Sequence, residues 1–314
     1  MTRPPTSTPA RRTLTASVLL ALCSTALAAD EPAKPAPYKP AGEILAASPA
    51  ADWRPLDPEN TLYLELPAGR VVMELAPAFV PLHAQNIKTL VREKYFDGLA
   101  VIRSQDNYVV QWGDAEEDEK KARSLGSARA SFDPEFSVPV SAATSFSPLP
   151  DGDVYAPQVG FGDGFPAARD ADGKQTWLTH CYGAVGVARG NDTQGGNGSG
   201  LYVIIGHAPR HLDRNVTVVG RVVQGMELLS TLPRGTGALG FYEKPEQRVP
   251  IRTIRVAADL PAAERTPLEV LRTDSPTFEA VTEARRNRRD DWTVAAAGRI
   301  ELCNVQIPVR APKT

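Results

Sequence analysis

Short β-rich runs separated by glycine constrain most strongly how this chain can fold. The runs LYLEL and RVVMEL flank a Pro-Ala-Gly turn, and GAVGVARG, GLYVIIG and VTVVGRVV follow further along the chain. Strands of this length with glycine-rich turns between them are typical of antiparallel barrels and sandwiches. The sequence therefore predicts a mainly β domain that begins with a hairpin.

One amphipathic helix is expected among these strands. In PLHAQNIKTLVREKYF, from Pro81 to Phe96, apolar residues recur at helical spacing, and proline suits the first turn of a helix. Two further β-rich runs, AVIRS and NYVVQWG, come directly after it. We expect the helix to cover part of the sheet that these strands form.

The composition limits the function. The chain has 314 residues, of which 42% are apolar and 23% are charged, and this is enough for a large domain with a substantial core. Its formal net charge is −2. Nucleic-acid-binding domains are usually basic, so we expect no nucleic-acid partner.

The N-terminus has the pattern of a signal peptide. Arg11 and Arg12 precede the apolar run LTASVLLALCSTALA, which ends in a small-x-small pattern at Ala28. We expect cleavage after Ala28 and a periplasmic location, by the ordinary secretory route rather than the twin-arginine one. The run is too short to remain as a membrane anchor, and Leu22 before Cys23 disfavours a lipid anchor.

The remaining segments outside the strands predict a linker, an insertion and an extension. Residues 29–59 are rich in proline and alanine without periodicity, which is typical of a linker. Residues 115–182 contain a long insertion with a loop system at its centre. Residues 259–314 are expected to add a helix from Ser275 to about Asp290 and a final strand in IELCNVQIPV.

Metal and nucleophile motifs are weak in this sequence. Asp170 and Asp172 resemble a fragment of a calcium loop, but the later ligands are absent, and an ordinary Asp-Gly turn is favoured. Ser199 does not occupy the centre of a Gly-x-Ser-x-Gly motif. We expect no metal and no cofactor. Whether Cys181 and Cys303 pair stays open, and a small buried hydrophobe is the favoured role for Cys303.

The segment YFDGLAVIRSQDNYVVQWGD, residues 95–114, resembles the signature of the cyclophilins, which are peptidyl-prolyl cis-trans isomerases. The hairpin LYLELPAGRVVMEL, the run GAVGVARG, the block NGSGLYVIIGHAPRHLDRNVTVVGRVVQGMELL and the final IRTIRV occur in the order of that family. The resemblance covers about residues 60–258. It implies a closed eight-stranded antiparallel barrel capped by two helices, with a substrate groove on its outer face.

The resemblance also implies the residues of the site. Arg103 matches the catalytic arginine, and we expect it to be a donor left free on the outer face. The expected substrate-binding residues line the groove, its proline pocket and its rim: Tyr108, Val109, Gln111, Ala188, Arg189, Tyr202 and Leu212. The chain departs from the family pattern at Ile102, Gly200, His211 and Val216.

The resemblance implies a peptidyl-prolyl cis-trans isomerase that assists the folding of exported proteins. Its partners would be proline-containing unfolded polypeptides, and we expect a monomer. The alternative is a cyclophilin-fold binding module or holdase chaperone with little turnover, because several polar groove positions depart from the family.

Overall fold

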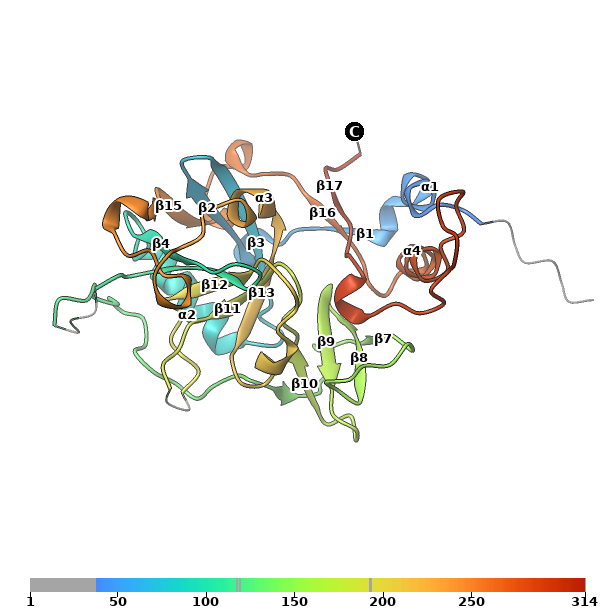
Figure 1. Cartoon of the computed structure of the whole chain (residues 1–314), viewed down its shortest axis with the longest axis horizontal. Coiled ribbons are helices and arrows are strands. Elements are labelled where there is room, and N and C mark those ends of the chain that lie inside the picture. The colour runs from blue at the N-terminus through green and yellow to red at the C-terminus, as the bar shows by residue number, and fades with distance from the viewer. Residues whose placement is uncertain (1–37, 117, 119, 192–193, 314) are drawn as a thin grey trace, which may run out of the picture. The chain divides into compact units, whose positions relative to one another are not determined.

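The computed structural model describes residues 38–116, 118, 120–191 and 194–313 (Figure 1). The predicted signal peptide, residues 1–28, lies outside the described residues. Within the described part of the chain, no helix is long and apolar enough to span a bilayer.

The main sheet is antiparallel and contains nine of the described strands. The predicted hairpin is present as its strands β2 and β3, which pair from Thr61 with Glu74 to Leu66 with Gly69. The strand order is β14 (Val249–Pro250), β4 (Ala100–Ser104), β5 (Val109–Gly113), β12 (Leu201–Ile204), β11 (Ala184–Val187), β13 (Val218–Gln224), β3 (Gly69–Leu75), β2 (Thr61–Leu66) and β15 (Thr253–Val256).

A short stretch of chain joins the two edges of this sheet. The Ile251 N–H donates to the Leu99 carbonyl beside β4 at 2.8 Å, and the Arg252 N–H donates to the Glu65 carbonyl of β2 at 2.9 Å. The sheet therefore curls until its edges approach each other. Its edge strands β14 and β15 do not pair with each other in the described ladder, which is open and has nine strands. The curled antiparallel sheet agrees with the expected mainly β fold, and the described ladder does not confirm a closed eight-stranded barrel.

Two helices pack on the main sheet. The helix α2 (Pro81–Arg92) begins at the expected proline, and α3 (Met226–Ser230) follows β13. Ile87 and Leu90 of α2 and Leu229 of α3 are fully buried in the same core as Trp112 of β5. The helices and the sheet thus share one hydrophobic core.

The insertion contains a second sheet rather than only loops. The turn between its strands β9 and β10 is the expected Asp-Gly turn, in which the Gly173 N–H donates to the Asp170 carbonyl at 3.2 Å. The strand order is β6 (Val138–Pro139), β10 (Gln175–Leu178), β9 (Phe165–Arg169), β8 (Gln158–Gly162) and β7 (Ser147–Pro148).

The described part of the predicted linker and the C-terminal extension fold together. A third sheet has the order β1 (Trp53–Pro55), β16 (Glu269–Leu271) and β17 (Val309–Arg310). Only the end of the predicted final strand is a strand, because Leu302–Asn304 form a 3₁₀ turn and β17 begins at Val309, where it pairs with β16. The helices α1 (Ala41–Ala47) and α4 (Pro276–Arg286) lie side by side in Figure 1. Ser275 caps α4, which ends before the expected Asp290.

Short 3₁₀ turns connect these elements: η1 (Ala50–Asp52), η2 (Pro58–Asn60), η3 (Arg210–Leu212), η4 (Ala238–Gly240), η5 (Pro245–Gln247), η6 (Ala257–Asp259), η7 (Ala262–Glu264) and η8 (Leu302–Asn304).

The second and third sheets share one hydrophobic core, so that the insertion and the extension form one unit. Phe161 of β8 packs edge-to-face on Phe278 of α4, with ring centroids 4.9 Å apart. Leu302 is fully buried in the same core. A disulfide joins Cys181 to Cys303, with the two Cα atoms 5.0 Å apart. The favoured prediction, that Cys303 is a small buried hydrophobe, is therefore wrong. We call the unit formed by α1, β1, β6–β10, β16, α4 and β17 the second module.

Candidate functional site

Arg103, Gln111 and Tyr202 form one row across three neighbouring strands. Gln111 of β5 is the register partner of Arg103 on β4 and of Tyr202 on β12, and Tyr202 is in turn the partner of Gly186 on β11. Directly paired residues of antiparallel strands project from the same face of the sheet. The row therefore occupies the face of the sheet opposite the one on which Trp112 and Val203 lie.

A β-bulge directs Arg103 to this face. Val101 pairs with Trp112, whereas Arg103 pairs with Gln111, so Ile102 is the extra residue on β4. Bulges change the direction of the side chains that follow them and occur often beside active sites. The half-buried Ile102 is thus part of the bulge, and its carbonyl accepts a hydrogen bond from the Tyr242 N–H at 2.9 Å.

The Arg103 guanidinium is held by three acceptors, so the expectation of a free donor is wrong. Its Nε donates to the Leu239 carbonyl at 2.7 Å, its Nη1 donates to Gln111 Oε1 at 3.1 Å, and its Nη2 donates to Gln105 Oε1. Because a guanidinium has five N–H groups, these contacts leave two for another acceptor. The guanidinium of Arg103 is thus held in one orientation and still has two N–H groups that can donate to a substrate.

Aromatic rings flank the same guanidinium. Its carbon lies 5.3 Å from the ring centroid of Phe241 and 5.6 Å from that of Tyr108. Burial lowers the pKa of Arg103, and the nearby Tyr108 opposes this effect. An arginine remains charged at physiological pH despite such a shift, because its ordinary pKa is above 12. The site therefore presents a permanent cation in a partly apolar environment.

The loop that supplies Leu239 and Phe241 was missed by the sequence analysis. Phe241 forms an antiparallel bridge with Arg103, and the Gly235 N–H donates to the Ser104 carbonyl at 2.9 Å. Leu239 has a φ of 56°, which is uncommon for a residue other than glycine. The glycine-rich run GTGALG signals a turn here, but it does not reveal which strand the loop contacts.

Tyr202 forms a buried wall beside this row. Its ring lies over Gly186, where an added Cβ would come within 2.2 Å of the Tyr202 Cζ. Its hydroxyl is 2.8 Å from Nε2 of His180, a residue that the sequence analysis did not assign to the site. Burial raises the pKa of Tyr202 well above its ordinary value, so the hydroxyl remains protonated. Val109, also buried, is two residues before Gln111 on the same face.

The other predicted residues lie around this wall. Ala188 follows β11, and its N–H donates to the Gly200 carbonyl at 2.9 Å. Arg189 Nε donates to the Asn215 carbonyl at 2.9 Å, and the Asn215 N–H donates to the carbonyl of Leu212 at the end of η3. The structure thus brings Arg103, Tyr108 and Gln111 into contact, and it links Arg189 to Leu212 through Asn215.

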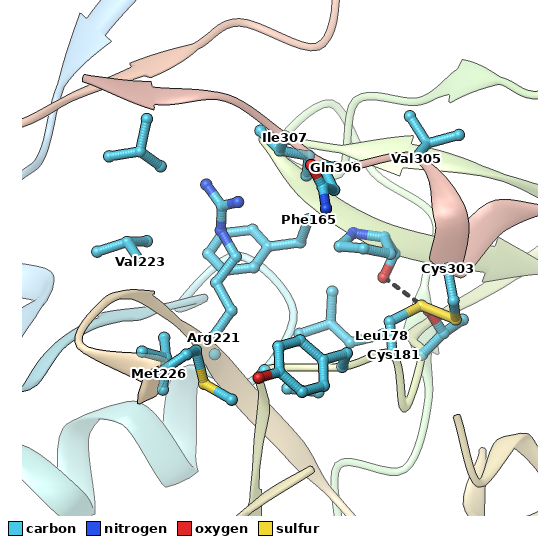
Figure 2. A pocket seen from close by; sticks show the side chains of 18 of the residues that line it. Phe165, Leu178, Cys181, Arg221, Val223, Met226, Cys303, Val305, Gln306 and Ile307 are labelled. Carbon is cyan, nitrogen blue, oxygen red and sulfur yellow. Dashed lines mark hydrogen bonds between the residues drawn. A yellow bond between two sulfur atoms is a disulfide. The ribbon is translucent and has the colours of Figure 1, made fainter. Parts of the chain in front are cut away.

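Figure 2 shows a cavity of about 660 Å³ at a different place. Its wall includes Phe165 of β9, Arg221 of β13, Met226 of α3 and Ile307 near the C-terminus. None of the predicted site residues lines it. The cavity therefore lies apart from the Arg103 row. In the described residues no group of three or more His, Cys, Asp or Glu side chains is arranged to hold a metal ion.

Comparisons with known proteins identify the family of the main sheet. Residues 61–256, more than half of the chain, match the family model described as cyclophilin type peptidyl-prolyl cis-trans isomerase/CLD. A probable peptidyl-prolyl cis-trans isomerase of Brucella suis is 30% identical over 61% of this chain and 81% of its own length. A relative of the same description from Brucella abortus is 29% identical over the same shares.

A solved structure supports the fold. The chain aligns with the crystal structure of the cyclophilin AquaCyp293 from Hirschia baltica with a TM-score of 0.63 and 24% identity, over 83% of this chain and 95% of that one. This alignment covers more of the chain than the family model does, so it extends beyond the main sheet. The match to the family model across the main sheet shows that the chain belongs to the cyclophilin-type peptidyl-prolyl cis-trans isomerase family.

Proposed function

We propose that this chain catalyses the cis/trans isomerisation of X-Pro bonds in exported proteins, and that Arg103 is its catalytic residue. The observation that carries the proposal is the row of Arg103, Gln111 and Tyr202 on one face of the main sheet. A charged donor, an amide and a buried aromatic wall lie next to one another there. These groups are suited to a prolyl peptide, which has a polar amide and an apolar ring.

The chemistry requires little more than such a surface. An X-Pro bond isomerises slowly because amide resonance imposes a barrier of about 18–20 kcal/mol. In the twisted transition state the prolyl nitrogen is pyramidal and more basic than in the planar amide. An N–H of Arg103 donates to that nitrogen, so the arginine stabilises the twisted state more than the planar one. No covalent bond is formed or broken.

The contacts of Arg103 prepare it for this step. Leu239, Gln111 and Gln105 accept three of its N–H groups and hold the guanidinium in one orientation. A donor that is already oriented does not have to reorganise during the reaction. The proline ring packs against Tyr202 and Val109, with Tyr108 and Leu212 at the edges, while the preceding carbonyl rotates.

The proposed compartment is the periplasm. The N-terminal pattern that ends at Ala28 and the disulfide between Cys181 and Cys303 support it, because disulfides persist in oxidising compartments. Expression of the full chain in a Gram-negative host, followed by fractionation and mass measurement, tests the proposal. We expect a periplasmic protein that begins at Ala29. An uncleaved cytoplasmic protein would contradict it.

The isomerase proposal is tested with an Ala-Ala-Pro-Phe peptide. Wild type is expected to accelerate its cis-to-trans conversion, and Arg103→Ala is expected to lower kcat/KM by about 100-fold, as does the loss of one oriented transition-state donor elsewhere. Arg252→Ala removes an exposed arginine and serves as the control. Equal rates for wild type and Arg103→Ala would contradict the proposal. A wild type that matches buffer but suppresses aggregation of an unfolded client would favour the holdase.

A further inference from the structure

We propose that His180 is a positioning residue for the proline pocket: it fixes the Tyr202 wall, and the second module holds it in place. The inference rests on the proposed function, since it assigns a role to the wall of the same site. The hydroxyl of Tyr202 is the group through which the rest of the molecule acts on the pocket.

The first step is the contact between Tyr202 and His180. The tyrosine hydroxyl is 2.8 Å from His180 Nε2, and the two rings are nearly parallel, with their centroids 6.2 Å apart. The His180 side chain is completely buried. A buried hydroxyl without a partner is costly, so the hydrogen bond selects the ring orientation that His180 can satisfy.

The second step is the contact between His180 and Asp213. Both the backbone N–H and the ring Nδ1 of His180 lie 2.9 Å from the same oxygen, Asp213 Oδ1. The carboxylate therefore fixes the backbone and the ring of His180 together. With a proton on Nδ1 directed to Asp213, Nε2 accepts the hydrogen bond of the Tyr202 hydroxyl. Asp213 directly follows Leu212, so one turn supports both the wall and the edge of the pocket.

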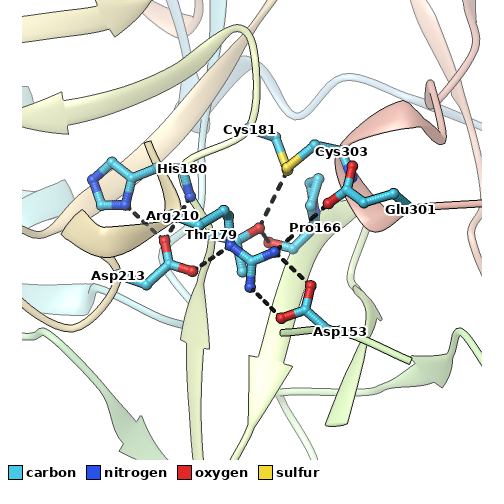
Figure 3. Close-up of a disulfide and its surroundings, with 9 residues drawn as sticks. All are labelled: Asp153, Pro166, Thr179, His180, Cys181, Arg210, Asp213, Glu301 and Cys303. Atoms are coloured by element: carbon cyan, nitrogen blue, oxygen red, sulfur yellow. Dashed lines mark hydrogen bonds and ion pairs between the residues drawn. A yellow bond between two sulfur atoms is a disulfide. The ribbon is translucent and has the colours of Figure 1, made fainter. Parts of the chain in front are cut away.

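The third step connects this pair to the second module. Arg210 Nε donates to Asp213 Oδ2 at 2.5 Å, and Arg210 Nη1 donates to Asp153 Oδ2 of the insertion at 2.9 Å. The side chains of Arg210 and Asp153 are each only 2% exposed. Glu301 Oε1 lies 3.8 Å from Arg210 Nη1. Figure 3 shows this line of contacts beside the disulfide.

The disulfide fixes the backbone next to His180. Cys181 directly follows His180, and its partner Cys303 lies in η8, two residues after Glu301. The disulfide thus connects the C-terminal extension to the segment that carries His180, and the contact of Glu301 with Arg210 connects it to the turn that carries Asp213. In this way the second module stabilises a wall of the proposed proline pocket.

A double-mutant cycle on Tyr202 and His180 tests the inference. The Kd and the kcat/KM for the Ala-Ala-Pro-Phe peptide are measured for wild type, His180→Leu, Tyr202→Phe and the double variant. We expect His180→Leu to raise Kd roughly tenfold, because it leaves the buried hydroxyl of Tyr202 without a partner. Tyr202→Phe is expected to raise Kd as well, because it removes the same hydrogen bond that orients the ring. The double variant is expected to bind no more weakly than His180→Leu, because the two substitutions break one interaction.

A purely structural role of His180 would give a different result. A general loss of folding would raise Kd by the same factor whether His180→Leu is made in wild type or in the Tyr202→Phe variant. His83→Leu is the matched control, because His83 is also completely buried and pairs with a carboxylate, that of Glu135. It is expected to lower the thermal midpoint and to leave Kd unchanged. If His180→Leu does not fold, His180→Asn takes its place in the cycle, because its amide can replace Nδ1 but is too short to replace Nε2.

Two results would overturn the inference: an unchanged Kd in His180→Leu, or a double variant in which the effects of the two single substitutions on Kd multiply. Peptide binding is measured by NMR separately from turnover. A wild type that binds the peptide without isomerising it would therefore contradict the proposed function and still test the role of His180.

Discussion

Gly186 provides the space that the Tyr202 wall requires. It stands opposite Tyr202 in the register of β11 and β12, and its missing side chain leaves room for the tyrosine ring. A family-wide motif identifies the aromatic position from the sequence, but not this neighbour. Gly186 comes earlier in the chain than Tyr202, and only the strand register places the two residues together.

Gly186→Ala is predicted to displace the Tyr202 ring. The added Cβ would lie 2.2 Å from its Cζ, and overpacking of this kind costs about 1–3 kcal/mol. We expect a lower free energy of unfolding and weaker binding of the proline peptide, measured by urea denaturation and NMR titration. Gly190→Ala is the control, because an added Cβ meets nothing within 4 Å there. Unchanged peptide binding in Gly186→Ala would contradict the assignment of Tyr202 to the pocket.

At the scale of single elements, segments that are distant in sequence hold the helices in place. The N-terminus of α2 illustrates this: Glu135 Oε1 and Oε2 accept the N–H groups of Leu82 and His83 at 3.0 and 2.9 Å. The sequence predicts where α2 begins, because Pro81 is a local signal. It does not predict the cap, because Glu135 belongs to the insertion.

Glu135→Ala is predicted to destabilise α2. It removes the acceptor of two N–H groups at the positive end of the helix and leaves the buried His83 without its carboxylate, at a cost of about 2 kcal/mol. The thermal midpoint should fall, as measured by calorimetry. Glu227→Ala, an exposed residue in the first turn of α3, should leave it nearly unchanged. An equal effect of the two substitutions would contradict the capping role.

The ion pair between Asp151 and Arg286 connects the insertion to α4 and predicts a pH dependence. The hydrogen bonds from Arg286 Nε and Nη2, and more weakly the Ile300 N–H, hold the pKa of Asp151 below its ordinary value against the opposite effect of burial. A lowered pKa in the folded state stabilises the fold fully above the unfolded value of about 3.9. This contribution is lost as the pH falls through the folded-state pKa.

Asp151→Asn is therefore predicted to reduce stability at neutral pH and to have a diminishing effect below about pH 4. Urea denaturation over a pH series measures the difference in the free energy of unfolding. Asp172→Asn removes an exposed ion pair with Lys174 and should change little at any pH. If the difference in the free energy of unfolding between wild type and Asp151→Asn grew as the pH falls, the predicted direction of the pH dependence would be contradicted.

At the scale of the whole molecule, the chain is a curled cyclophilin-like sheet with a second module attached to it. The sequence predicts the sheet well, because hairpins, glycine turns and the family motif are local patterns. It does not predict the second module. The core of this module contains Phe161, Phe278 and Leu302. The sequence assigns these residues to two separate segments, a loop system and an extension, and only contacts between distant residues bring them together.

Cys303→Ser tests how far the disulfide holds the second module together. The cross-link closes a loop of 122 residues, and in the chain-entropy model such a loop contributes about 4–5 kcal/mol through the unfolded state. We expect a clearly lower thermal midpoint and faster proteolysis of the C-terminal extension. Cys23 lies in the predicted signal peptide, so Cys23→Ser in the full chain should leave the stability of the mature protein unchanged. Equal stability of Cys303→Ser and wild type would contradict the role of the disulfide.

The central claim is that Arg103 acts on the twisted amide and contributes little to holding the planar substrate. The most direct test compares Kd and kcat for the Ala-Ala-Pro-Phe peptide in wild type and in Arg103→Ala, with binding followed by NMR titration. The account predicts that kcat falls by about 100-fold while Kd changes by less than about threefold. A loss of kcat/KM that arises entirely from weaker binding, with kcat unchanged, would contradict it.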